Sequence, residues 1–144
     1  MHAPNPVEPL YLSQMLLKIM LAHLQSVYPQ EGCGLLAGHN GRATHLYAIP
    51  NRLASATAFE MAPQEMVAAM LHLEAAGDAL LAIYHSHPAG PERPSSTDVA
   101  RHAYPDALQL IVSLRQRSRP RVRAFRIQNG LVRPVNLLIT AETE

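Results

Sequence analysis

The chain has 144 residues, of which 48% are hydrophobic and 16% charged, so it can form one packed domain and need not be disordered. Its single cysteine, Cys33, excludes an internal disulfide and every zinc site that needs two or more thiolates, including that of the zinc deaminases. The formal net charge is only +1, but seven of the twelve basic residues and two of the eleven acidic residues lie after residue 106. Because only one cysteine is available, any transition-metal site must use imidazoles and carboxylates.

No targeting or membrane segment is expected at the start of the chain. Residues 1–6 lack the basic region and apolar run of a signal peptide, and the apolar stretch over residues 15–24 is too short to span a bilayer. A cytoplasmic, reducing compartment is therefore the expected location. Residues 1–9 are predicted to form a flexible arm, residues 10–139 one domain, and residues 140–144 a tail.

The first part of the domain is predicted to contain a strand, a helix and a hairpin. Ser13 is a suitable N-cap for the helix, and His39-Asn40-Gly41 favours a tight hairpin turn. The predicted elements are an edge strand at 10–12, a helix at 14–26, and hairpin strands at 34–38 and 44–49. The apolar spacing predicts that one face of the helix consists of Met15, Leu16, Ile19, Met20, His23 and Leu24.

The rest of the chain is predicted to add a long helix, a helix start and several strands. The run over residues 79–84 is continuously apolar, which favours a central place in a sheet. Ser95-Ser96-Thr97-Asp98 is a helix-start signal, and Asn129-Gly130 favours a turn. The predicted elements are a strand at 59–61, a helix from Pro63 to a stop at Gly77, and strands at 79–84, 107–114, 122–127 and 131–139. This mixture predicts an α/β or α+β layer fold.

The segment after the central apolar run contains the residues with the clearest chemistry. His85 and His87 can converge on one ion once the chain leaves regular pleating, and Asp98 can return as an oxygen ligand. Two nitrogens and one carboxylate leave a fourth tetrahedral position open, as in catalytic zinc sites. Zinc would lower the pKa of a water there to about 7 and polarise a carbonyl. Amide hydrolysis would further require a carboxylate proton shuttle and an oxyanion donor.

The spacing of these residues resembles the signature of the JAMM (MPN+, Mov34/PAD-1) metallopeptidase family. In that signature a distant Glu precedes His-Ser/Thr-His-Pro, and a Ser and an Asp follow at fixed spacing. Here His85-Ser86-His87-Pro88 is followed after seven residues by Ser95, and after two more by Asp98. The distant Glu corresponds to Glu31, in a segment that is similar to the family's first strand. The resemblance extends over roughly residues 10–139.

The resemblance implies a role for five residues. His85, His87 and Asp98 would bind one zinc ion. Glu31 would take a proton from the zinc-bound water and pass it to the leaving amine, and Ser95 would donate a hydrogen bond to the oxyanion. The implied fold is a single JAB1/MPN-like domain with a cytidine-deaminase-like architecture, in which helices flank a central curved mixed β-sheet and the metal lies at one sheet edge.

The resemblance also implies a substrate class. The implied reaction is hydrolysis of the peptide or isopeptide bond after the C-terminal glycine of a ubiquitin-like or sulfur-carrier protein. The stretches at about 50–62 and 99–107 are short where eukaryotic deubiquitinases carry the two insertions that hold two ubiquitins. The chain is therefore more similar to the small prokaryotic members, and selectivity for polyubiquitin linkages is not expected.

Several of these residues also have ordinary interpretations. Without the resemblance, Glu31 would be taken for a surface carboxylate, and Ser86 points away from the ligands and supports the loop. Cys33 is a candidate thiol nucleophile with His85, although a small buried strand residue is the favoured interpretation. His23 is predicted to be a core or boundary histidine. Four histidines receive no role: His39, His45, His72 and His102.

Other functions remain open at this stage. The arginine cluster within residues 115–126 is predicted to decorate a hairpin end, either as a solvated, charge-protected edge or as a docking patch for an acidic carrier protein. Nucleic acid is the less favoured partner, and binding to it is not expected, because Phe125 is the only aromatic residue there. The alternatives are a RadC-like, DNA-associated or scaffold module of the same fold, and a small-amide metallohydrolase. Another divalent ion in place of zinc and a homodimer are also open.

Overall fold

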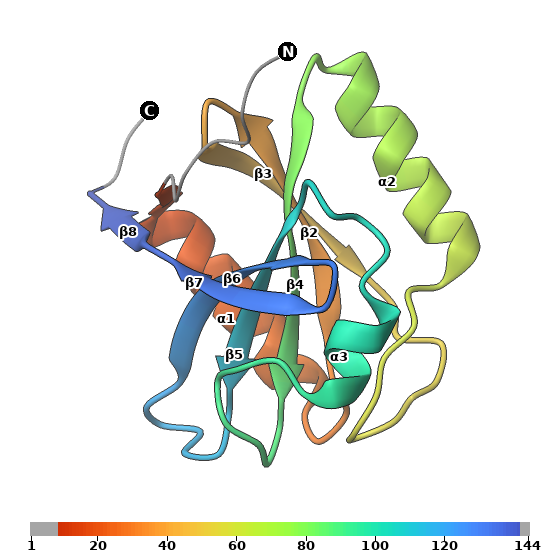
Figure 1. Cartoon of the computed structure of the whole chain (residues 1–144), viewed down its shortest axis with the longest axis vertical. Helices are drawn as coiled ribbons and strands as arrows, with labels where there is room; N and C mark the ends of the chain where they lie inside the picture. Colours follow the sequence, from red (N-terminus) through yellow and green to blue (C-terminus); the bar gives the residue numbers. More distant parts are fainter. Residues whose placement is uncertain (1–8, 142–144) are drawn as a thin grey trace.

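The computed structural model describes residues 9–141 as an eight-stranded mixed sheet with three helices (Figure 1). The strand order is β7-β6-β5-β4-β2-β3-β1-β8, and the β4–β5, β1–β3 and β1–β8 pairs are parallel. The strands are β1 (Leu10–Ser13), β2 (Cys33–His39), β3 (Arg42–Ile49), β4 (Ala79–His87), β5 (Leu108–Ser113), β6 (Arg121–Gln128), β7 (Leu131–Val135) and β8 (Leu137–Thr140). The helices are α1 (Gln14–Val27), α2 (Pro63–Ala75) and α3 (Ser96–Arg101). The predicted α+β class with a mixed sheet is confirmed.

Two apolar layers cover the two faces of this sheet. In the view of Figure 1, α1 lies behind the sheet and α2 lies on the opposite side. Met20 and Leu24 of α1 are fully buried against one face, together with Tyr84 of β4. Leu73 of α2 is buried against the other face, together with Ile83. Because side chains alternate along β4, its odd-numbered residues from Ile83 onward face α2 and α3.

The predicted helix start at Ser13 and the two predicted hairpin turns are confirmed. The Ser13 hydroxyl accepts a hydrogen bond of 3.1 Å from the Leu16 amide and caps α1. Asn40 and Gly41 adopt positive φ angles of 57° and 75°, as a tight two-residue hairpin turn requires. The predicted turn at Asn129-Gly130 has the same form, with φ angles of 53° and 77°.

Several element predictions are wrong in detail. The strand at 10–12 is not at the sheet edge, because β8 pairs with its outer side. Residues 59–61 form only an isolated bridge, between Met61 and Asn51, and the predicted strand 131–139 is divided into β7 and β8. The predicted apolar face of α1 is wrong at two positions, because Met15 and Ile19 are exposed to solvent. Leu17 and Leu21 pack against the core instead.

Of the predicted arm at residues 1–9 only residue 9 is described, and of the predicted tail at 140–144 only residues 140 and 141, with Thr140 as the last residue of β8. These domain boundaries stay predictions. Within residues 9–141, none of the helices has both the length and the apolar character needed to cross a bilayer.

Candidate active site

The two histidines of the predicted site lie at the end of the central strand β4, on one face of it. Their Nε2 atoms are 3.1 Å apart, and both face Asp98 Oδ2, at 3.3 Å from His85 and 3.0 Å from His87. The expected departure from regular pleating is not needed, because residues two apart in a strand point to the same side. The site also lies at the end of a strand inside the sheet and not along its lateral edge.

Asp98 reaches the histidines because a capping box fixes the start of α3. The Ser95 hydroxyl accepts a hydrogen bond of 3.1 Å from the Asp98 amide, and the Ser95 amide donates one of 2.8 Å to Asp98 Oδ2. The Ser95 hydroxyl therefore uses an acceptor position in the cap and keeps its own proton free for another partner.

The second nitrogen of His87 is fixed by the loop that follows β4. His87 Nδ1 lies 2.7 Å from the Pro91 carbonyl oxygen, so it must be the protonated nitrogen and must donate. His87 Nε2 is then left unprotonated in the neutral ring and can act as a ligand. A carbonyl in this position is a frequent outer-shell partner of metal-binding histidine.

Burial and charge shift the pKa values of the three groups in different directions. Burial lowers the pKa of His85, which is completely inaccessible to solvent. Burial also acts against the charged form of His87, but hydrogen bonds with Asp98 and Pro91 outweigh it and raise the pKa of His87. Burial would raise the pKa of Asp98, yet hydrogen bonds from the two imidazoles hold it well below its usual range. Asp98 is therefore an anion next to two imidazoles.

These three donors fit a divalent metal ion. One atom from each of His85, His87 and Asp98 lies within 4.8 Å of the others, and no other such group of three occurs among residues 9–141. Two imidazole nitrogens and one carboxylate oxygen are the donor set of several catalytic zinc sites, and the histidines are buried.

Glu31 supplies a buried carboxylate immediately before β2. Glu31 is only 4% exposed to solvent, and its Oε1 has no hydrogen-bond partner within the described part of the chain. Its backbone is held on both sides, since the amide donates to Ser55 and the carbonyl accepts from Asn51 Nδ2. Burial raises the pKa of Glu31 from 4.5 to about 7; His87 opposes this shift and Asp98 adds to it.

A serine between the two histidines joins the Glu31 segment to β4. The Ser86 hydroxyl accepts a hydrogen bond of 2.9 Å from the Gly32 amide, and the Ser86 amide donates to the Gly32 carbonyl at 3.0 Å. Ser86 is fully buried on the face opposite to the histidines, as its position in the strand predicts. The supporting role expected for it is consistent with these bonds, although its partner is the Glu31 segment.

Two cavities meet the site from different sides. The larger, of about 590 Å³, is bordered by Asp98, α3 and the segment around Phe59, whose ring stacks on His85 at 4.5 Å between centroids. The smaller, of about 300 Å³, is lined by Glu31, Ser95 and His87 together with the loop after β4. The proposed base and oxyanion donor therefore open into the same cavity.

The raised pKa of Glu31 predicts a pH-dependent stability difference in the metal-free protein. The folded state binds a proton that the unfolded state releases, so this contribution to stability is present below about pH 4.5 and is lost as the pH rises towards 7. Relative to Glu31→Gln, the metal-free wild type should lose on the order of 2 kcal/mol of unfolding free energy between pH 5 and pH 8. Urea unfolding of both proteins at the two pH values measures this; a constant difference would contradict it.

The sequence matches the family described as prokaryotic homologs of the JAB domain, Prok-JAB, over residues 13–128. The chain belongs to this family. The expected resemblance is thereby confirmed. The CysO-cysteine peptidase of Mycobacterium tuberculosis is similar to this chain, with 36% identity over 127 residues, covering 85% of this chain and 87% of that protein. The desampylase of Haloferax volcanii is 39% identical over 88 residues, covering 59% and 63%.

Solved structures agree with the Prok-JAB assignment. Protein DSY2949 from Desulfitobacterium hafniense has a TM-score of 0.84 and 31% identity, covering 93% of this chain and 94% of its own. AF2198, a JAB1/MPN domain protein from Archaeoglobus fulgidus, has a TM-score of 0.58 and 21% identity, covering 89% and 98%, and shows the shared fold. The expected JAB1/MPN-like domain is thus confirmed.

The cysteine and the other histidines considered in this Prok-JAB domain make contacts that are typical of structural residues. Cys33 is fully buried, its Sγ lies 3.3 Å from the Ile49 carbonyl as a donor, and burial, with Glu31, raises its pKa to about 12, which argues against a thiol nucleophile. His23 bonds to the Tyr84 hydroxyl at 2.8 Å. His39 and His45 contact Asp78 at 3.3 and 3.2 Å, far along β4 from the site.

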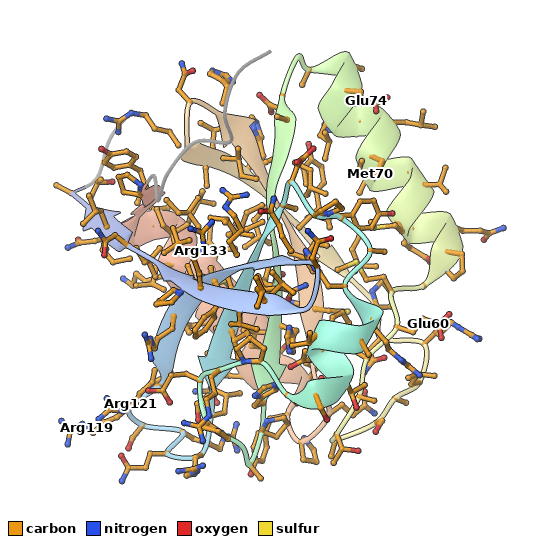
Figure 2. The ribbon with its side chains drawn as sticks, viewed as in Figure 1. Glu60, Met70, Glu74, Arg119, Arg121 and Arg133 are labelled. Carbon is orange, nitrogen blue, oxygen red and sulfur yellow. The ribbon has the colours of Figure 1, made fainter. Side chains whose placement is uncertain are left out.

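The arginine cluster lies only in part at the end of the β5–β6 hairpin, as predicted. Arg115, Arg117 and Arg119 lie between the two strands and Arg121 begins β6, whereas Arg123 and Arg126 lie further along β6. Figure 2 shows Arg119 and Arg121 extending away from the body of the protein there. β5 ends beside His87, and the Ser113 hydroxyl donates to the Gly90 carbonyl at 2.6 Å. The cluster therefore borders the loop that lines the smaller cavity.

Proposed function

We propose that this protein is a metal-dependent peptidase that hydrolyses the bond after the C-terminal glycine of a ubiquitin-like or sulfur-carrier protein. In this proposal His85, His87 and Asp98 hold one zinc ion, Glu31 is the general base and acid, and Ser95 stabilises the oxyanion. The observation that carries it is the buried Glu31 carboxylate, whose Oε1 lacks a partner among the described residues and which shares a cavity with His87 and Ser95.

The proposed mechanism assigns one proton path and one hydrogen bond to the protein. A bound divalent ion supplies Lewis-acid polarisation of the scissile carbonyl and lowers the pKa of water. Glu31, with its pKa near neutrality, accepts the proton of the attacking water and transfers it to the leaving amine. The Ser95 hydroxyl, whose proton is not used by the helix cap, donates to the oxygen on which negative charge develops.

The choice of zinc rests on the donor chemistry. Imidazole nitrogen suits zinc, copper, iron and nickel, whereas magnesium and calcium prefer oxygen ligands. Two imidazoles and one carboxylate with a buried acid nearby favour zinc in its hydrolytic role. Metal analysis of the purified protein, before and after dialysis against a chelator, tests this choice directly.

Three observations support a carrier protein as the substrate. Relatives across most of the chain are named CysO-cysteine peptidase, and shorter matches are named desampylase or probable TtuB-protein conjugate cleaving protease. The larger cavity is bordered by apolar side chains, including Phe59, Met61 and Ile83, next to Asp98. The Arg119 and Arg121 surface offers positive charge to an acidic carrier, at a hairpin end that contacts the loop lining the smaller cavity.

The proposal predicts metal-dependent cleavage of a carrier fusion. A ubiquitin-like carrier extended beyond its terminal glycine by a short peptide or by cysteine should be cut after that glycine, and mass spectrometry identifies the products. Cleavage should stop after chelation and return with zinc, and it should fall at least tenfold when the terminal glycine is replaced by valine. Since the arginine surface attracts an acidic carrier, KM should rise with salt.

Two other results would overturn this function in favour of an alternative. Cleavage of small amides but not of the fusion would indicate a small-amide hydrolase. Salt-sensitive DNA binding that is lost on replacement of the arginine cluster, without peptidase activity, would indicate the RadC-like binding module.

A further inference from the structure

A buried glutamine links the site to the larger cavity. Gln109 lies in β5 and is only 4% exposed. Its strand runs parallel to β4, with Ile83 opposite Gln109 and His85 opposite Ile111, so the glutamine side chain lies on the same face as His85. A fully polar side chain at such a position needs hydrogen-bond partners for both ends of its amide.

The nitrogen end of this amide has a clear partner. Gln109 Nε2 lies 2.8 Å from His102 Nδ1, and because an amide nitrogen can only donate, Nδ1 must be the acceptor. Neutral His102 then carries its proton on Nε2. Burial lowers the pKa of His102, in agreement with the neutral ring.

The oxygen end faces a matching unpaired donor. Gln109 Oε1 and His85 Nδ1 are both buried, and neither has a hydrogen-bond partner among residues 9–141. The two side chains lie on the same face of two paired strands, two residues apart in the register. The corresponding nitrogen of His87 is already paired with the Pro91 carbonyl. His85 alone therefore needs such an acceptor, and Gln109 Oε1 is placed to be it.

The hydrogen bond to His102 decides which end of the amide remains for the metal site. His102 and Gln109 both line the space of about 590 Å³ next to Asp98. Because Gln109 Nε2 is already paired with His102 Nδ1, Oε1 is the end of the amide that is left for His85.

We propose that Gln109 is a positioning residue of the metal centre. Its Oε1 accepts from His85 Nδ1 and keeps Nε2 of that ring directed at the metal. Its Nε2 donates to His102 Nδ1, which holds the amide in this orientation. The inference rests on the metal site of the proposed function and not on its substrate.

Two variants test this role. Gln109→Leu removes both bonds and should weaken zinc binding by about 10- to 100-fold. Gln109→Glu keeps an acceptor for His85 but loses the donor to His102, so zinc affinity should stay within about threefold of that of the wild type.

The measurements must distinguish positioning from simple stability. Zinc affinity is measured by competition with a chromophoric chelator, and the visible spectrum of the cobalt-substituted protein reports the ligand geometry. The thermal midpoint of each metal-free variant shows whether it folds, and Gln128→Leu, at a partly exposed site in β6, is the matched control. Wild-type zinc affinity and an unchanged cobalt spectrum in Gln109→Leu would overturn the positioning role.

The zinc and cobalt measurements need no substrate, so they test Gln109 even if the carrier fusion is not cleaved. A wild type that binds zinc but does not cleave the fusion would overturn the proposed substrate and leave the role of Gln109 standing. A wild type that binds no zinc would overturn the proposed metal site and this role together.

Discussion

Replacing Glu31 by Gln will lower kcat by about a thousandfold, within the range of roughly 10²–10⁴ typical of a general acid–base residue. The amide has nearly the same shape as the carboxylate but cannot accept a proton at neutral pH, so the water loses its base and the amine its acid. Zinc should remain bound, because the three proposed ligands and the Ser86–Gly32 bonds are unchanged. Single-turnover cleavage of the carrier fusion, with metal content measured on the same samples, checks both expectations.

The control for this experiment is Glu74→Gln, an exposed carboxylate on α2 that Figure 2 shows far from the site. It should retain the wild-type kcat. A kcat for Glu31→Gln within threefold of the wild type would remove Glu31 from the mechanism. Loss of zinc from this variant would instead mean that the carboxylate helps to hold the metal.

Replacing Asp98 by Asn will weaken zinc binding by at least about 100-fold and abolish cleavage at low zinc concentration. Among residues 9–141, Asp98 is the one anion that both imidazoles contact, and its charge is retained at physiological pH because its pKa is held well below the usual range. Asparagine keeps an oxygen that can accept from the Ser95 amide, so α3 should remain capped and the metal-free protein folded. Chelator competition measures affinity, and circular dichroism checks the fold.

Asp106→Asn, in the exposed turn before β5, provides the same chemical change outside the site and should bind zinc normally. Wild-type zinc affinity in Asp98→Asn would exclude this carboxylate as a ligand. Cleavage that returns at high zinc concentration would support a ligand role and not a general structural one.

The part of the site that depends on spacing along the chain could be predicted from the sequence. His85, His87, Ser95 and Asp98 lie within fourteen residues, joined by a strand end, a loop and a helix cap that each leave a local signal. The structure brings these side chains together as expected. Their catalytic roles stay predictions, whereas the family and fold are confirmed by the match to the Prok-JAB family and by related structures.

The parts that depend on pairing between distant segments could not be predicted. Gln109 lies next to the site only because β5 pairs with β4, where its side chain also contacts His102. No spacing in the sequence indicates that register. The position of β1 inside the sheet depends on β8, which comes from the other end of the domain. For the same reason, the exposure of Met15 and Ile19 depends on which side of α1 meets the sheet, and several faces of that helix carry apolar residues.

The double hydrogen bond between Ser86 and Gly32 has a consequence for how such a protein can acquire new substrates. Since Ser86 lies between the two histidines and Gly32 follows Glu31, the proposed proton shuttle and two of the proposed metal ligands are parts of one hydrogen-bonded unit. The segments at 50–62 and 88–94 lie outside this unit and border the two cavities. Exchanging these loops between relatives should therefore transfer substrate preference without rebuilding the chemistry, which makes the domain a suitable scaffold for engineered cleavage of other carrier tails.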